Sequence, residues 1–106
     1  MSTLPTISVV TPSYNQAAYL EATLRSVIAH RRDVAEYLVF DGGSDDDSAA
    51  IIARHAAAID HWQTAPDGGQ AAAISAGFAR STGDILVWIN SDDLIAPGAV
   101  ARVRRA

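Results

Sequence analysis

Two adjacent carboxylates at the end of an apolar run are the residues of this sequence best suited to chemistry. The run at residues 85–89 stops at Asn90, and Ser91, Asp92 and Asp93 follow it. Neighbouring carboxylates repel each other unless a positive charge lies beside them, and Mg²⁺ or Mn²⁺ accepts such oxygen ligands together with phosphate oxygens. The pair is therefore a candidate metal site for a phosphorylated ligand. The alternative is that one aspartate caps the following turn and the other is merely exposed.

Polar residues also follow two earlier apolar runs. Asp41 is followed by two glycines, which allow a flat ligand to approach the backbone closely. Its carboxylate could accept a hydrogen bond from the imide of a uracil ring or from a ribose hydroxyl. Thr11, Pro12 and Tyr14 could form the wall of a base site, although an ordinary turn would have the same sequence. Asp67 begins a glycine-containing segment before a helix, where free N–H groups can hold an anion, but a plain turn fits it as well.

Apolar spacing predicts the elements that position these residues. Strands are expected at 7–11, 36–40, 61–64 and 85–89, and helices at 17–30, 48–58 and 70–79. Pro12 is expected to end the first strand because proline lacks a ladder donor, and Asn15 is expected to cap the first helix. The unbroken run at 85–89 predicts a strand that is buried on both faces.

The alternation of strands and helices predicts the fold class. We expect an α/β domain of three layers, with a mainly parallel, Rossmann-like sheet of about four strands between flanking helices. Ligands bind such sheets at the carboxyl ends of the strands, where all the candidate residues fall. A chain of 106 residues is expected to form a single domain over residues 1–106.

Composition excludes several other classes of protein. The net charge is −4 and the sequence contains no lysine, which argues against a nucleic-acid surface. It also contains no cysteine, which excludes thiolate metal sites. No apolar stretch approaches the roughly 18 residues of a membrane span, and no signal-peptide pattern begins the chain, so a cytoplasmic protein is expected. Glycine-rich phosphate and dinucleotide motifs are missing from the sequence, as is a serine-nucleophile elbow.

Four ordered motifs together resemble a known family. They are residues 7–15 (ISVVTPSYN), 41–46 (DGGSDD), 67–70 (DGGQ) and 88–93 (WINSDD), with AGF at 76–78 and TGD at 82–84 between the last two. In this order they closely resemble the N-terminal half of family 2 glycosyltransferases, which have the GT-A fold. The resemblance covers nearly the whole chain.

The resemblance implies a nucleotide-sugar donor, most simply a UDP-sugar, and a saccharide or other hydroxyl compound as acceptor. By resemblance, Thr11, Pro12 and Tyr14 line the nucleoside site and Asp41 meets the base. Asp67 and Ser91 belong to the same donor site. Asp93 is implied as the main ligand of Mg²⁺ or Mn²⁺, with Asp92 nearer the ribose and sugar. Members of the family generally transfer one sugar with inversion, and the metal stabilises the diphosphate leaving group.

Some features depart from the family pattern. Gly68 stands where many similar sequences carry Lys or Arg, and Ala72 and Ser75 replace more polar residues. The general base of the family lies well downstream, so we expect it beyond Ala106, name no catalytic residue here and expect the chain to be truncated and inactive alone. A sheet that stops after its fourth strand leaves an edge uncovered, which predicts a homodimer or larger oligomer.

Two other functions fit parts of the sequence. A noncatalytic regulatory or interaction module could bind Mg²⁺ through the same acids, although a receiver-like domain would carry a lysine near its last strands. A nucleotidyltransferase would share the acids at the strand ends, but the glycine-rich basic loop of that class is missing after the first strand.

Overall fold

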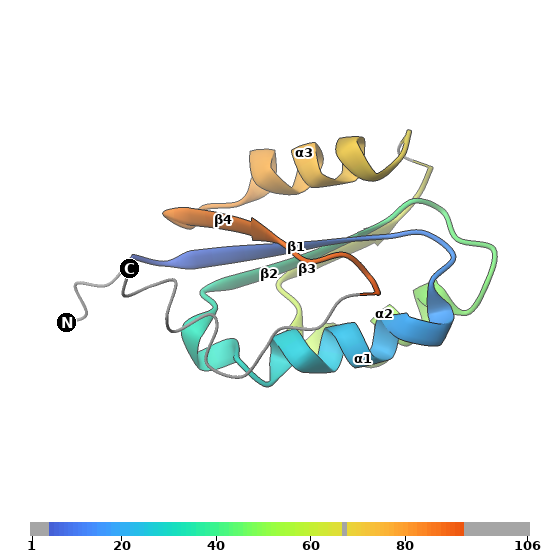
Figure 1. The fold of residues 1–106 in the computed structure, drawn as a ribbon, viewed down its shortest axis with the longest axis horizontal. Coiled ribbons are helices and arrows are strands. Elements are labelled where there is room, and N and C mark those ends of the chain that lie inside the picture. Colours follow the sequence, from blue (N-terminus) through green and yellow to red (C-terminus); the bar gives the residue numbers. More distant parts are fainter. Residues whose placement is uncertain (1–4, 67, 93–106) are drawn as a thin grey trace.

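The computed structural model describes residues 5–66 and 68–92, so Asp67 and Asp93 lie outside the described part. Four parallel strands of the described chain form a sheet in the order β3-β2-β1-β4. Helices α1 and α2 cover one face and α3 covers the other, which confirms the predicted three-layer α/β fold (Figure 1). The elements are β1 (Ile7–Ser13), α1 (Ala17–Ile28), the 3₁₀ turn η1 (Arg31–Asp33), β2 (Glu36–Asp41), α2 (Ser48–Arg54), the 3₁₀ turn η2 (Ala56–Ala58), β3 (His61–Thr64), α3 (Gln70–Arg80) and β4 (Ile85–Trp88). The helix predicted at 48–58 is thus divided into α2 and η2.

Side chains alternate along β1 and β2 between the two faces of the sheet, and this alternation divides the core. Val9 and Val39 belong to a large cluster on the α1 and α2 side, whereas Val10 and Leu38 pack beneath α3. The larger cluster also includes the apolar side of α1, with Leu24 fully buried. The apolar face of α1 therefore contributes to the burial that holds this layer on the sheet.

Pro12 does not end β1, and that prediction was wrong. The strand continues through Pro12 to Ser13, which still pairs with β2. The N–H of Ile89 donates to the Val10 carbonyl, and the N–H of Ile85 donates to the Thr6 carbonyl. The backbone N–H and C=O groups of even-numbered residues along β1 are therefore directed at β4. The N–H that Pro12 lacks would also be directed at the β4 side, but the pairing of β1 with β4 has already ended at Val10. The proline therefore removes no hydrogen bond of the ladder.

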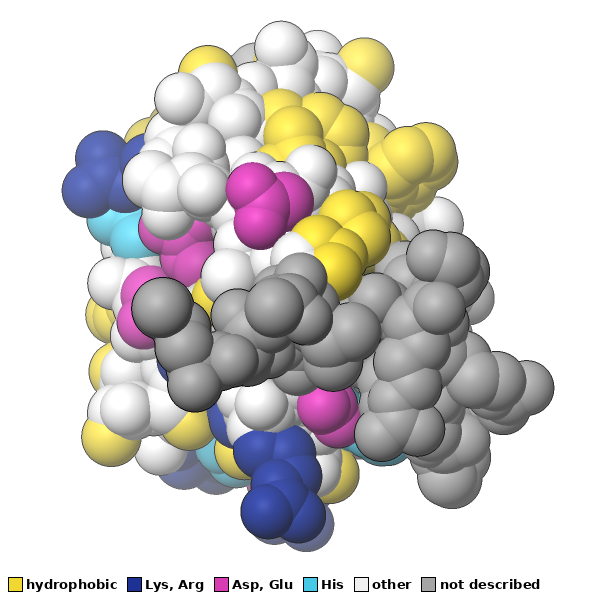
Figure 2. All heavy atoms as spheres, turned by 90° about the vertical axis from the view of Figure 1, so that its left-hand side faces the viewer, with side chains coloured by type: hydrophobic (Ala, Val, Ile, Leu, Met, Phe, Trp, Pro, Cys, Tyr) yellow, Lys and Arg dark blue, Asp and Glu magenta, His cyan; other side chains and the backbone are white. Residues whose placement is uncertain are grey.

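The expectation that β4 is buried on both faces was also wrong. Within the described sheet β4 is an edge strand, and Leu86 and Trp88 are 41% and 51% exposed. In the described chain α3 packs mainly over β1 and β2, and its Phe78 ring meets Trp88 of β4 at 6.3 Å between centroids. Figure 2 shows hydrophobic side chains at the surface in the upper half of the view, at the height of α3 and β4.

Asn15 is not the N-cap of α1, because Gln16 occupies that position. Asn15 adopts a left-handed conformation with φ of 51°, and its side-chain oxygen accepts the N–H of Asp45 at 2.8 Å. The carboxylate of Asp46 instead accepts the N–H of Ala17 at 3.0 Å. The loop after β2 therefore caps α1 from outside the helix and fixes the two segments against each other.

Helix α3 lies unusually close to β1 at Gly77. A Cβ atom on this glycine would lie 2.5 and 2.8 Å from the two methyl carbons of Val10, which is fully buried. Valine is stiff about χ1 and cannot move aside easily. The glycine is therefore needed for the close approach of the helix to the sheet.

We expect Gly77→Ala to destabilise the domain. In an exposed helix this change stabilises by about 1 kcal/mol, whereas here overpacking against Val10 should lower the free energy of unfolding by about 1–3 kcal/mol. Urea denaturation measures the sign directly. The exposed neighbour Ala76 provides the control, since Ala76→Gly reports helix propensity alone in the same helix. A stabilised Gly77→Ala variant would show that the close contact is absent.

The homo-oligomer stays a prediction. Its structural basis is the edge strand β4 with exposed Leu86 and Trp88, because an unpaired strand edge with apolar side chains favours association. Sedimentation velocity over a hundredfold concentration range should show a species heavier than the monomer, and Trp88→Glu should return it to monomer. A monomer at every concentration would refute the expectation.

Candidate functional site

A pocket of about 570 Å³ opens at the carboxyl end of the sheet, where the sequence predicted a ligand crevice. Four segments that are distant in the sequence contribute to it: the end of β1, the residue after β2, the start of α3 and the segment after β4. Its lining residues are Pro12, Ser13, Tyr14, Gln16, Gly42, Pro66, Gly68, Gly69, Gln70, Ala73, Asn90, Ser91 and Asp92. The fold thus brings Pro12, Tyr14, Ser91 and Asp92 together in the lining of one pocket, and their roles in binding a donor stay a prediction.

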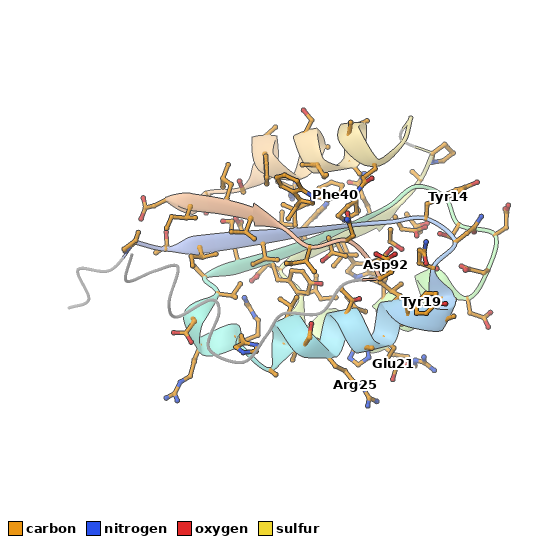
Figure 3. The ribbon with its side chains drawn as sticks, viewed as in Figure 1. Tyr14, Tyr19, Glu21, Arg25, Phe40 and Asp92 are labelled. Atoms are coloured by element: carbon orange, nitrogen blue, oxygen red, sulfur yellow. The ribbon has the colours of Figure 1, made fainter. Side chains whose placement is uncertain are left out.

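Tyr14 and Pro12 form the wall of the pocket at the end of β1. Tyr14 is 57% exposed, and it lies at the same end of the molecule as Asp92 (Figure 3). Thr11 does not line the pocket, because its side chain points to the opposite face of the sheet. There its hydroxyl lies 2.8 Å from that of Tyr37, and both residues are fully buried. Burial raises the pKa of the Tyr37 phenol, so this pair is a neutral hydrogen bond within the core.

The segment after β4 is attached to a helix on each side. The hydroxyl of Thr23 in α1 donates to the Ser91 carbonyl at 2.9 Å, and the side-chain amide of Gln70 in α3 donates to the Asn90 side chain. Ser91 is buried, while Asp92 is exposed to the pocket. The adjacent position, Asp93, lies outside the described residues. Asp92 therefore lines the pocket directly after two residues that are hydrogen-bonded to the flanking helices.

Asp41 is held inside the loop that follows β2. Its carboxylate accepts the backbone N–H and the hydroxyl of Ser44, at 2.9 and 2.5 Å, and the hydroxyl of Thr64 at 2.7 Å. The residue is 1% exposed and does not line the pocket, whereas the adjacent Gly42 does. Burial by itself would raise the pKa of Asp41, but the hydrogen bonds from Ser44 and Thr64 outweigh it and lower the pKa. The described geometry leaves this carboxylate occupied by the protein, and its predicted contact with a base stays a prediction.

Several residues that shape the site were missed by the sequence analysis. Ser44 carried a usable signal, because a serine shortly after an aspartate in a glycine-containing turn often bonds back to it. Thr23 and Thr64 carried none, since each lies far in the sequence from its partner. The same holds for the Gln70 side chain, which the tertiary structure brings to Asn90.

The charge of the pocket limits how it can hold an anion. Asp92 is the one charged residue among those that line it, so the described wall provides no Lys or Arg for a phosphate. No three carboxylate, imidazole or thiolate groups gather into a metal site in the described part of the chain. Asn90 and Asp92 nevertheless supply hard oxygen donors at one wall, a set that suits Mg²⁺ or Mn²⁺ if phosphate oxygens and water complete the coordination.

Comparison with known proteins identifies the family. The sequence profile described as "Glycosyl transferase family 2" matches residues 8–106. The chain belongs to glycosyl transferase family 2. An uncharacterised glycosyltransferase of Mycobacterium tuberculosis (strain H37Rv) is 39% identical over 108 aligned residues, which cover 100% of this chain. The alignment covers 41% of that relative, so the chain spans about two fifths of its length.

Two solved structures have a fold similar to that of this chain. Residues 1–349 of S. aureus TarS in complex with UDP-GlcNAc superimpose with a TM-score of 0.80 at 20% identity, over 92% of this chain and 30% of that TarS fragment. Glucosyl-3-phosphoglycerate synthase from Mycobacterium tuberculosis, crystallised with Mn²⁺, UDP and glucosyl-3-phosphoglycerate, gives a TM-score of 0.65 at 33% identity. That match covers 82% of this chain and 33% of the synthase. The described sheet and helices thus match the Rossmann-like GT-A architecture.

Asp41 predicts an acid-dependent stability. A carboxylate with a lowered folded pKa stabilises the protein above the pKa of the unfolded group, about 3.9, and this contribution is lost as the pH falls through the folded pKa. Asp41→Asn should lower the free energy of unfolding by about 1–3 kcal/mol at neutral pH, because an amide NH₂ would face the N–H and O–H donors of the loop. The variant should also show a shallower loss of stability below about pH 4.

Denaturation by urea at several pH values measures both effects. Asp45→Asn is the matched control, since Asp45 lies exposed in the same loop and should retain the acid dependence of the parent protein. Parallel stability curves for Asp41→Asn and the parent protein would contradict the assigned role.

Proposed function

We propose that this chain forms the donor-binding domain, over residues 1–106, of an inverting family 2 glycosyltransferase. The donor is a nucleoside diphosphate-sugar, a UDP-sugar in the simplest case, bound with Mg²⁺ or Mn²⁺. The observation that carries the proposal is the pocket in which an aromatic wall, a helix N-terminus and the carboxylate of Asp92 meet. Family membership and the UDP complex of the synthase that is 33% identical support the choice of ligand.

The nucleoside would lie against Pro12 and Tyr14. Both line the pocket at the end of β1, and the exposed phenol ring of Tyr14 offers an apolar face with a polar tip. Gly42 lets the ligand approach the backbone after β2. Asp41 would fix this loop from beneath, and Thr11 would support the wall through its bond to Tyr37.

The diphosphate would lie between the start of α3 and the segment after β4. Gly68 and Gly69 have positive φ angles of 86° and 117°, and they direct the chain into the first turn of α3 at the pocket wall. The first N–H groups of a helix favour an anion. We assign the metal to Asp93 and Asp92, with Asp67 and Ser91 completing the donor site. When bound, the cation would offset the charge of the diphosphate leaving group.

Transfer needs an acceptor and a base as well. We propose a saccharide or another hydroxyl compound as acceptor, and a general base beyond residue 106, in line with the greater length of the relatives. Residues 1–106 would then bind the donor without completing the transfer. The family match disfavours the alternative of a noncatalytic Mg²⁺-binding regulatory module.

The proposal extends to the partners and the location of the protein. The net charge of −4 and the acidic pocket argue against a nucleic-acid partner. Among the helices of the described chain, none has the length and apolar character that crossing a membrane requires. We propose a cytoplasmic location, where nucleotide-sugars are available.

The charge of the pocket predicts that UDP binding depends on the metal. Because no Lys or Arg lines the described pocket wall, isothermal titration of UDP should give measurable heat with Mn²⁺ and at least about tenfold weaker binding with EDTA. Asp92→Asn should weaken the Mn²⁺-dependent binding, while Asp47→Asn, an exposed carboxylate outside the pocket, should leave it unchanged. A folded protein that gives no heat under either condition would refute the proposed function.

A further inference from the structure

Thr23 makes a contact that its place in the sequence does not explain. It lies in the middle of α1 and is fully buried, yet its hydroxyl is directed at the Ser91 carbonyl, 68 residues further along the chain. The donor–acceptor distance is 2.9 Å, and Ser91 is itself only 5% exposed. Little water can compete for this bond, so it is worth more than a surface hydrogen bond.

A threonine inside a helix usually bonds to the carbonyl four residues before it. Here that carbonyl, of Tyr19, lies 3.4 Å from the Thr23 hydroxyl, whereas the Ser91 carbonyl lies at 2.9 Å. Of these two acceptors, the shorter distance favours the Ser91 carbonyl as the partner of the hydroxyl. The bond therefore joins α1 to the acidic segment instead of adding to the helix.

The Ser91 carbonyl belongs to the same planar peptide group as the N–H of Asp92. Fixing its oxygen fixes the orientation of that plane and hence the direction in which the chain continues through Asp92. The bond from Gln70 to Asn90 holds the preceding residue from the α3 side, but it lies in the exposed pocket wall. The buried attachment of the segment is the one made by Thr23.

We propose that Thr23 is a positioning residue for the metal and diphosphate end of the donor site. It acts through the Ser91–Asp92 peptide, which sets the carboxylate side chain of the acidic segment against the pocket. The inference rests on the proposed function, and it adds a residue on the far side of the segment that touches neither nucleotide nor metal. Hydrogen-bonded supports of this kind typically change metal affinity by about tenfold or more when removed.

The test separates the hydroxyl from the shape of the side chain. Thr23→Val keeps the branched shape and removes the donor, and Thr23→Ser keeps the donor and removes a methyl group. Electron paramagnetic resonance of free Mn²⁺ in the presence of saturating UDP measures metal affinity in each variant. We expect about tenfold weaker Mn²⁺ binding in Thr23→Val and affinity close to that of the parent protein in Thr23→Ser.

Further measurements exclude a general loss of structure. Ser81→Ala is the matched control, because the Ser81 hydroxyl bonds to the Phe78 carbonyl at the other end of α3 and its removal should leave Mn²⁺ binding unchanged. Weak binding of uridine alone, followed by NMR, should be equal in Thr23→Val and the parent protein, since the nucleoside wall is not attached to Thr23. If Thr23→Val does not fold, Thr23→Ala replaces it with a residue that favours helix.

The possible outcomes distinguish the two proposals. Mn²⁺ affinity that is unchanged in Thr23→Val, or equally weak in Thr23→Ser, would overturn the positioning role while the donor site stands. Equal losses of uridine and Mn²⁺ binding would overturn it in favour of a purely structural role. Failure of the parent protein to bind UDP with Mn²⁺ would overturn the proposed function, and this inference with it.

Discussion

The register of β1 with its two neighbours is the constraint on which the site depends. β1 pairs with β2 as far as Ser13 opposite Asp41, but its pairing with β4 ends at Val10 opposite Trp88. The central strand therefore extends past the end of β4. The space beside that extension is where the segment after β4 turns away and where α3 begins, so the offset between the two ladders produces the pocket. Side-chain alternation then directs Pro12 to the pocket and Thr11 to the core.

Side-chain hydrogen bonds preserve this arrangement at the edge of the sheet, where the ladders stop and polar groups would otherwise lose their partners. The Asp41 carboxylate accepts hydrogen bonds from Ser44 in the loop after β2 and from Thr64 in β3, and Asp46 of the same loop caps α1. Thr23 does the same for the segment after β4. The bonds of Thr64, Ala17 and Thr23 each join two elements, whereas the bond from Ser44 closes the loop after β2 on itself.

The electrostatics of the pocket distinguish it from anion sites built on arginine or lysine. The described wall carries one carboxylate and the N-terminal turn of α3, and the net charge of the chain is −4. A free diphosphate would be repelled by the carboxylate and only weakly attracted by the helix end. A divalent cation reverses this balance, because it converts the carboxylate from a repelling group into a ligand. Gly68 adds no charge to the start of α3, so the described wall offers an anion no basic side chain of its own.

The sequence by itself determined the order of strands and helices, the fold class, the family and the position of Asp92 just after the last strand. Those features depend on periodicity and turn residues within short windows. The tertiary structure decided that β4 is an edge strand, that Pro12 lies inside β1, and that Asp41 bonds to its own loop. An apolar run has the same sequence pattern at the centre and at the edge of a sheet. A threonine within a helix likewise gives no local sign of whether its hydroxyl bonds to its own helix or to a distant carbonyl. Strand order and register decide between these cases, because they bring together residues that no local pattern connects.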